Sequence, residues 1–332
     1  MAGIRDVAKL AGVGVGTASR IINNTGSVSD AARLKVEKAM AELNYTPNAL
    51  ARSFYHKRSG IVAVLVPTVS HPFFAEFLDY VEKELYEHSL KTMICNTANE
   101  KNYELEYLNM LKSHMVDGMI TGVHSLNVES YSEIDKPIVA LDRYINSSIP
   151  VVAVDHWRGG QLAAETLVAA GCKEVVLFQE SNLVESPTQA RYKAFVDVLQ
   201  RENVVLHPYS LEWNKFGIDY FDEITEEAFH NHPTVDAVYG TDLLALSYMK
   251  VAVRNGKVVP NDLKVVAYDG TLVTKVINYS IYVIKQPIEQ LAKESVRLLV
   301  NKIEGKELQD NSIRLAVDLI TPRTHKRKVS VR

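Results

Sequence analysis

Apolar side chains in the first part of the chain recur at the spacing of short amphipathic helices. Ile4, Val7, Ala8 and Ala11 follow one another at three- and four-residue intervals, which predicts one buried helical face. Gly12 comes directly after this face, and glycine commonly ends a helix because it accepts a positive φ. The sequence therefore begins with a helix of about two turns.

Two more helices are expected directly after the first. The second runs from about residue 15 to residue 23 and buries Ala18, Ile21 and Ile22. The third runs from about residue 30 to residue 43, with Ser29 as its N-cap. The apolar residues expected to cover the first two helices are Leu34, Val36, Ala39, Met40 and Leu43. Two short helices joined by a tight turn and covered by a third are typical of a helix-turn-helix unit.

Beyond residue 60, short apolar runs alternate with helical patterns. The segments are 61–66, 74–88, 92–95, 103–114, 118–120 and 138–141, followed by 160–170, 174–178, 189–200, 237–239, 243–253 and 263–268. This alternation predicts parallel sheets covered by helices. Because the pattern restarts near residue 160, the sequence predicts two α/β lobes.

The charges divide unequally between these parts. Residues 1–60 contain nine Lys/Arg and four Asp/Glu, a net charge of +5, whereas the whole chain carries −3 and residues 61–332 therefore carry −8. A basic head on an acidic body favours a nucleic-acid reader over a small helical bundle with solvated basic residues. Gly12, Gly14 and Gly16 do not form a dinucleotide loop, since such a loop must follow a buried strand.

Several other classes of protein find no support in the sequence. There is no early apolar run typical of a signal peptide and no run of about 20 apolar residues that could span a membrane. Cys95 and Cys172 lack metal or redox spacing, and no catalytic motif surrounds any His, Ser or Cys. We expect a cytoplasmic protein that is not an enzyme and binds no membrane, metal or cofactor.

The chain contains the runs DVAKLAGV, SRIINN and MAELNYTPNALARS, followed by SGIVAVLVP and HPFF. With these runs it resembles the LacI/GalR family of bacterial transcriptional regulators over essentially its full length. The resemblance implies an N-terminal all-α helix-turn-helix head plus an α/β two-lobed periplasmic-binding-protein-like core.

The resemblance also implies a division into domains. The DNA-binding head is expected at 1–46, a hinge helix and linker at 47–59, and a core for effector binding and dimerisation at 60–332. Crossings near 155–160, 285 and 318 would place the N-lobe at about 60–157 plus 288–318. The C-lobe would then take about 158–287 plus 319–332, with a final strand at 315–320 at the last crossing.

The expected DNA contacts come from the second helix and from the hinge. The helical pattern leaves Thr17, Ser19, Arg20 and Asn23 on the outer face, where Arg20 can bond a guanine edge. The resemblance adds Val15, Gly16, Ser29, Asn48, Ala51 and Phe54. Phe54 stands where the family has a Leu that enters the minor groove, and a Phe can also kink DNA; the alternative is a buried aromatic under the linker. Gly16 has no side chain to read a base, which predicts weaker discrimination at one operator base pair.

The expected effector site lies at the carboxyl ends of the strands, between the lobes. The resemblance matches effector-contacting positions to Phe73, Phe74, Asp142, Arg191, Trp213, Thr241 and Asp269. Carboxylates and a guanidinium can bond the hydroxyls of a sugar, and a Trp face can pack on its apolar side. Trp213 is expected in a loop at 208–217. Other roles remain open for some of these residues. Asp142 and Asp269 can instead cap helices, and Phe73 and Phe74 can belong to the core. Asp242 can also cap a helix, in which case it does not bind the effector.

Three functions are compatible with these expectations. The first is a homodimeric repressor of sugar-utilisation genes that a small sugar or sugar phosphate releases from double-stranded operator DNA. The second is a regulator whose DNA binding is tightened by a purine co-repressor or a phosphorylated carrier protein. The third, a sugar-binding transport protein, is disfavoured by the basic head. The runs VVAYDGT and IKQPIEQLAKESVRLLV look most similar to sucrose or fructoside regulators.

Overall fold

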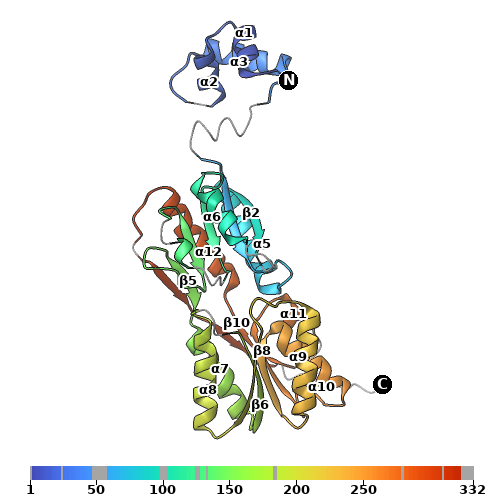
Figure 1. Cartoon of the computed structure of the whole chain (residues 1–332). Coiled ribbons are helices and arrows are strands. Elements are labelled where there is room, and N and C mark those ends of the chain that lie inside the picture. The colour runs from blue at the N-terminus through green and yellow to red at the C-terminus, as the bar shows by residue number, and fades with distance from the viewer. Residues whose placement is uncertain are drawn as a thin grey trace, which may run out of the picture. The chain divides into compact units, whose positions relative to one another are not determined.

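The chain divides into two compact units, residues 1–60 and residues 61–332 (Figure 1). The computed structural model describes residues 2–23, 25–46, 58–97, 103–123, 128–131, 134–181, 185–277, 280–308 and 310–322. Of the hinge helix and linker expected at 47–59, residues 47–57, with Asn48, Ala51 and Phe54, lie outside the described residues. No helix in the described ranges is long and apolar enough to cross a membrane.

The first unit is built from three helices, as the apolar spacing predicts. They are α1 (Ile4–Ala11), α2 (Val15–Ile22) and α3 (Asp30–Glu42). Gly12 ends α1 in the left-handed conformation at φ 65°, and the Ser29 hydroxyl accepts a hydrogen bond from the Ala32 amide at 3.3 Å to cap α3. Both terminal signals are confirmed.

The prediction that Leu34 belongs to the buried face of the third helix is wrong. Leu34 is 62% exposed, whereas Val36 and Ala39 are buried against the other two helices. A helix turns by about 100° per residue, so Leu34 lies roughly 200° around α3 from Val36 and cannot share its face.

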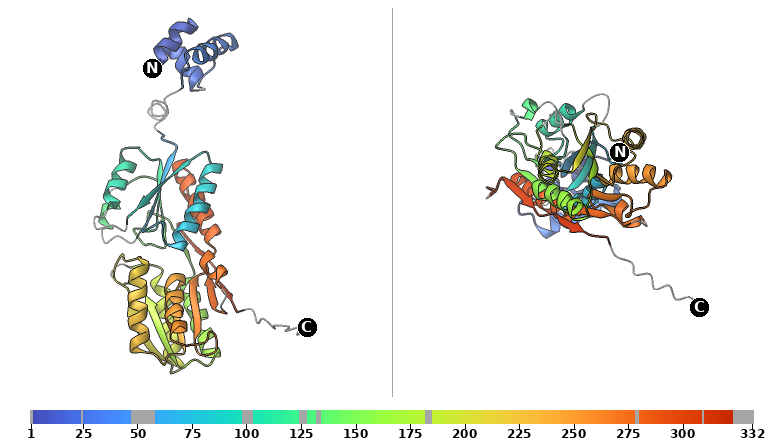
Figure 2. Two further views of the ribbon diagram at one scale, coloured as in Figure 1. Left: turned by 90° about the vertical axis from the view of Figure 1, so that its right-hand side faces the viewer. Right: turned by 90° about the horizontal axis from the view of Figure 1, so that it is seen from below.

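The second unit contains two six-stranded sheets, which form two lobes (Figures 1 and 2). The first sheet has the order β11-β5-β4-β3-β1-β2, and all its neighbouring strands are parallel. Its strands are β1 (Ile61–Val66), β2 (Lys91–Asn96), β3 (Gly118–Thr121), β4 (Ile138–Leu141), β5 (Val151–Val154) and β11 (Ser312–Leu315).

Helices cover both faces of the first sheet. Val62, Val64 and Val66 pack toward α5 (Pro72–Glu87) and α12 (Ile288–Ile303). Ala63 and Leu65 point to the opposite face and pack with α6 (Glu104–Lys112) and the short helix η1 (Glu129–Tyr131). A strand buried on both faces is apolar at every position, which explains the unbroken apolar run 61–66.

The second sheet has the order β12-β10-β9-β8-β6-β7. Its strands are β6 (Glu174–Gln179), β7 (Val205–Ser210), β8 (Ala237–Thr241), β9 (Lys264–Asp269), β10 (Tyr282–Lys285) and β12 (Asp318–Ile320), and only β12 runs antiparallel to its neighbour. One face is covered by α7 (His156–Ala169) and α8 (Gln189–Arg201), the other by α9 (Ile218–Asn231) and α10 (Asp242–Arg254), and the short helix α11 (Leu272–Val276) follows β9.

Two details of the predicted strands are wrong. The expected single strand at 315–320 is two strands, β11 in the first sheet and β12 in the second, so the chain crosses between lobes at residues 316 and 317. The segment 208–217 was expected to be a loop, but residues 208–210 belong to β7. Pro208 is accommodated because β7 is an edge strand, where the missing amide costs no ladder bond.

The first turn of α7 packs unusually closely against its neighbours. Its N-cap, Asp155, accepts a hydrogen bond from the Arg158 amide at 2.9 Å. A Cβ on Gly159 would lie 2.7 Å from the Tyr268 hydroxyl oxygen, and a Cβ on Gly160 would lie 2.0 Å from the backbone carbonyl oxygen of Arg191. Helices α7 and α8 therefore pack directly against each other at Gly160, where there is no room for a side chain.

Gly160→Ala should destabilise the core by about 3 kcal/mol or more, because the new methyl group meets rigid backbone. The measurement is the denaturant midpoint of core unfolding. Gly217→Ala is the matched control in the same lobe, since nothing lies within 4 Å of a Cβ there. Equal midpoints for both variants would contradict this description of the packing.

Candidate functional site

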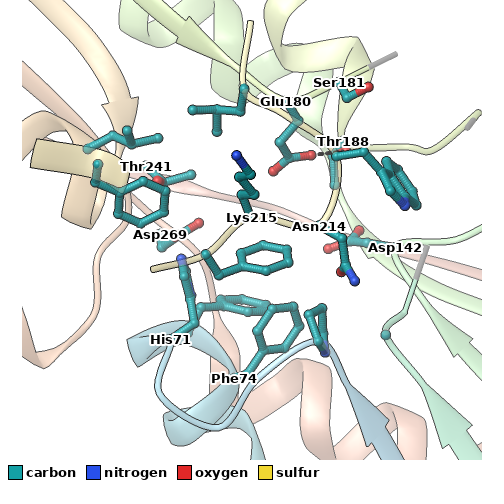
Figure 3. A pocket seen from close by; sticks show the side chains of 18 of the residues that line it. His71, Phe74, Asp142, Glu180, Ser181, Thr188, Asn214, Lys215, Thr241 and Asp269 are labelled. Carbon is teal, nitrogen blue, oxygen red and sulfur yellow. Dashed lines mark hydrogen bonds between the residues drawn. The ribbon is translucent and has the colours of Figure 1, made fainter. Parts of the chain in front are cut away.

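The carboxyl ends of both sheets meet at one pocket between the lobes (Figure 3). Residues at or just after the ends of β1, β3 and β4 line one side, and residues at or just after the ends of β6, β7, β8, β9 and β10 line the other. The cavity has a volume of about 120 Å³. Figure 3 shows His71 and Phe74 facing Glu180 and Thr188 across the cavity, with Asp142 at its side.

All seven residues predicted from the sequence for this site line the pocket. They are Phe73, Phe74, Asp142, Arg191, Trp213, Thr241 and Asp269. Their convergence from separate elements is what the strand-end argument requires. That they bind an effector stays a prediction.

The sequence reasoning missed several lining residues. They are His71, Glu180, Ser181, Thr188, Glu212, Asn214, Lys215, Phe216 and Gln286. The strand-end rule could have found Glu180 and Gln286, which directly follow β6 and β10. No such signal exists for Lys215, because it lies in the loop between β7 and α9, whose path depends on tertiary packing.

Arg191 forms the charged floor of the pocket. The residue is only 3% exposed. Its Nη2 donates to Glu180 Oε1 at 2.6 Å and to the Tyr192 hydroxyl at 2.8 Å, and its guanidinium lies 4.5 Å from the centroid of the Tyr268 ring. Its buried Nε has no hydrogen-bond partner among the described residues. A buried N–H without a partner is costly, so this donor suits an oxygen of a bound ligand.

Asp142 does not cap a helix. It follows β4 at φ 48°, an uncommon conformation for a side chain other than glycine. Its Oδ1 lies 2.8 Å from Nε2 of His156, whereas the N-cap of α7 is Asp155. The helix-cap alternative for Asp142 is therefore wrong.

Asp269 and Asp242 have different roles near the end of β9. Asp269 lines the pocket and accepts a hydrogen bond from Gln286 Nε2 at 2.8 Å, and burial raises the pKa of its carboxyl group well above the usual range. Asp242 accepts from the amides of Gly270 and Thr271 at 3.2 and 2.7 Å, and burial raises its pKa to about 6. Asp242 thus holds the loop after β9 and does not cap its own helix.

Aromatic rings form the apolar side of the pocket. Phe73 is buried and stacks on Phe77 in the core, and Phe74 meets Phe73 edge-on with ring centroids 5.3 Å apart. Both therefore pack in the lobe and line the pocket, so the core alternative and the binding role are compatible. The His71 ring lies 5.6 Å from the Phe74 ring and 6.2 Å from the Phe216 ring, measured between centroids.

The head presents the predicted recognition residues on α2 with different exposures. Val15 is 45% exposed, and Gly16 and Arg20 are also exposed. Thr17, Ser19 and Asn23 are half-buried, and Asn23 Nδ2 donates to Ser19 Oγ at 3.2 Å. The Ser29 hydroxyl oxygen accepts the hydrogen bond that caps α3. The arrangement leaves Val15 and Arg20 as the most accessible side chains for base edges.

No group of three or more His, Cys, Asp or Glu in the described part of the chain could hold a metal ion. The two cysteines are buried without a disulfide, and burial raises the pKa of the Cys172 thiol to about 11.

Comparisons with known proteins agree with this geometry. Residues 3–48 match the family described as bacterial regulatory proteins, lacI family, and residues 59–323 match the periplasmic binding proteins and sugar binding domain of the LacI family. The chain therefore belongs to the LacI family, a family of transcriptional regulators, with a helix-turn-helix head and a two-lobed α/β core.

Individual relatives resemble the chain over nearly its whole length. A ribose operon repressor from Halalkalibacterium halodurans is 37% identical over 98% of this chain and 98% of its own length. A sucrose operon repressor from Pediococcus pentosaceus is 35% identical over 91% and 92% of the two chains. A LacI family regulator from Enterococcus faecium, solved with bound ribose, has a TM-score of 0.68 and 25% identity, covering 79% of this chain and 97% of its own.

His71 should make the stability of the core sensitive to acid. Burial lowers the pKa of its imidazole from 6.5 to about 4. Between these two pH values His71 is therefore protonated in the unfolded chain and neutral in the folded chain, so stability falls as the pH falls. Lowering the pH from 6.5 to 4 should therefore destabilise the wild type relative to His71→Phe by about 3 kcal/mol. Unfolding free energies of both proteins across this range provide the measurement. A constant difference between them would contradict the neutral, buried state of His71.

Proposed function

We propose that the protein is a sequence-specific DNA-binding repressor of sugar-utilisation genes, released from its operator when a small neutral sugar fills the pocket between the lobes. The observation that carries this proposal is the convergence of Asp142, Arg191, Trp213 and Asp269 on one cavity at the carboxyl ends of both sheets. The names of the ribose and sucrose operon repressors among its relatives support it.

The charges of the pocket favour a neutral sugar over a sugar phosphate. Four acidic and two basic residues line the described part of the pocket. Both cations already have carboxylate partners: Arg191 pairs with Glu180 at 2.6 Å and Lys215 with Glu212 at 2.7 Å. Even with Asp269 uncharged, the acidic groups outnumber the basic ones. A phosphate would meet an excess of negative charge, whereas neutral hydroxyls can both donate to carboxylates and accept from Arg191.

Ribose is the first candidate for this neutral sugar. The regulator from Enterococcus faecium was solved with bound ribose, and a ribose operon repressor is 37% identical over 98% of this chain. Sucrose is the candidate that the sucrose operon repressor provides. Fructose is the candidate that the expected likeness to fructoside regulators provides.

In the proposed function, the helix-turn-helix head binds the operator DNA. As a homodimer, two copies of α2 would enter successive major grooves of a near-palindromic operator, and the segment 48–55 with Phe54 would contact the minor groove between them. Sugar binding between the lobes would change their relative orientation and weaken operator binding. A coupling free energy of about 1–3 kcal/mol would change operator affinity roughly 5- to 150-fold.

Arg20→Ala should cost about 1–3 kcal/mol of operator binding and relax the preference at one position of each half-site, because Arg20 is exposed on α2 and can bond a guanine edge. The measurement is operator affinity against single-base variants at fixed salt. Lys38→Ala is the control, since Lys38 is an exposed cation on α3. If both variants lose affinity equally for all DNA sequences, Arg20 contacts only the backbone.

Arg191→Ala should abolish the response to sugar while operator binding persists, because Arg191 lies in the pocket of the core and not in the head.

Calorimetric titration with D-ribose, D-fructose, sucrose and D-ribose 5-phosphate should show a neutral monosaccharide binding to the wild type at least tenfold more tightly than the phosphate ester. Arg201→Ala, an exposed change at the end of the same helix, should behave as the wild type.

Sugar binding by Arg191→Ala at wild-type affinity would place the effector elsewhere. Tighter binding of the phosphate ester than of any neutral sugar would overturn the charge argument.

A further inference from the structure

His156 bonds to both lobes at the place where the chain first crosses between them. It is the first residue of α7, directly after β5 and the cap residue Asp155, and its side chain is only 1% exposed. Its Nε2 lies 2.8 Å from Oδ1 of Asp142, which follows β4 of the first sheet. Its Nδ1 lies 2.9 Å from the hydroxyl of Tyr268, in β9 of the second sheet. One imidazole thus joins a pocket carboxylate to the opposite sheet.

The two hydrogen bonds of His156 differ in what their partners can do. A carboxylate accepts hydrogen bonds, so Nε2–H of His156 is the donor to Asp142 Oδ1. The Tyr268 hydroxyl can both donate and accept, so it can bond to Nδ1 in either role. His156 is thus held between the Asp142 carboxylate and the Tyr268 hydroxyl.

The second-lobe end of this link is closely packed. The absence of a side chain at Gly159 lets the Tyr268 hydroxyl pack against α7, where a Cβ would lie 2.7 Å from its oxygen. The ring of Tyr268 lies under the guanidinium of Arg191, 4.5 Å from centroid to guanidinium carbon. Asp142 and Arg191, the two pocket residues best suited to sugar hydroxyls, are therefore connected through His156 and Tyr268.

A second path closes this connection into a ring. The backbone carbonyl of Asp142 accepts a hydrogen bond from Ser186 Oγ at 2.8 Å, and Ser186 Oγ accepts one from the backbone amide of Thr188 at 3.2 Å. Thr188 Oγ1 in turn donates to Glu180 Oε2 at 3.0 Å, and Glu180 pairs with Arg191. The main chain and the carboxylate of Asp142 are thus tied separately to the second lobe. Asp142 is therefore connected across the lobe boundary in two ways.

We propose that His156 is a positioning residue with two separable duties, an inference that rests on the proposed function. Through Nε2 it holds the Asp142 carboxylate in the orientation that binds the sugar. Through Nδ1 and Tyr268 it connects the occupied pocket to the orientation of the second lobe, and so to the sugar-dependent change in operator affinity. In the absence of operator DNA, only the first duty affects how tightly sugar binds.

The test separates the two nitrogens in the full-length protein. His156→Phe removes both bonds, His156→Gln keeps an N–H donor toward Asp142 only, and Tyr268→Phe keeps the ring under Arg191 but removes the hydroxyl. Sugar affinity is measured by titration with D-ribose, D-fructose and sucrose, and operator affinity is measured with and without the sugar that binds. Trp157→Ala, an exposed change at the next position of α7, is the control.

His156→Phe should raise the sugar Kd roughly 10- to 100-fold, the effect of losing a buried hydrogen bond to a charged group. His156→Gln and Tyr268→Phe should keep the sugar Kd within about threefold of the wild type, yet lose most of the sugar-dependent change in operator affinity. Trp157→Ala should match the wild type in both measurements.

Wild-type sugar affinity in His156→Phe would overturn the proposal, as would a full sugar response in Tyr268→Phe. Since Tyr268→Phe retains the packed ring, this second arm stands even if His156→Phe fails to fold. A wild type that binds none of the three sugars would instead overturn the proposed function.

Discussion

The contact between Gly160 of α7 and the backbone carbonyl of Arg191 constrains much of the core. Because no side chain separates the two helices there, α8 lies directly against the first turn of α7, and Arg191 is held beneath the pocket. The neighbouring Gly159 leaves room for the Tyr268 hydroxyl in the same way. The segment that joins the two lobes is therefore also the segment that fixes the floor of the binding site, which makes lobe orientation and pocket geometry interdependent.

The chemistry of the pocket follows from how its charges are compensated. Arg191 is buried, and a buried cation needs a partner; Glu180 and the faces and hydroxyls of tyrosines supply it. Asp269 is buried beside Gln286 with a raised pKa, so its carboxyl group can act as a donor as well as an acceptor. Such a site offers directional hydrogen bonds without a net positive field. This combination suits polyhydroxylated neutral molecules and repels anions.

Local patterns predicted the elements well and the connections between elements less well. The apolar runs marked β1, β4 and β9 because strands buried on both faces are apolar throughout. The split of 315–320 into β11 and β12 could not be read, since a continuous β pattern does not show which sheet each half joins. Leu34 was misplaced because a third helix with apolar residues on several faces has no unique buried face.

The same limit applies to the site. Strand ends located the carboxylates, since parallel strands bring their carboxyl ends to one edge. The partners of those carboxylates are set by tertiary contacts between distant segments, and no spacing in the sequence connects Asp142 with His156 or Asp242 with Thr271. For the same reason Asp142 and Asp242 resembled helix caps in the sequence, while in the structure both bond to other segments.

In the proposed function, a neutral monosaccharide in the pocket controls operator binding. Its most direct test is the affinity of the purified full-length protein for operator DNA recovered by selection, at fixed salt, with and without D-ribose, D-fructose, sucrose and their phosphate esters. We expect one neutral monosaccharide to weaken operator binding roughly 5- to 150-fold and the phosphate esters to leave it unchanged. No response to any sugar, or tighter DNA binding with one of these compounds, would contradict it and favour a co-repressor.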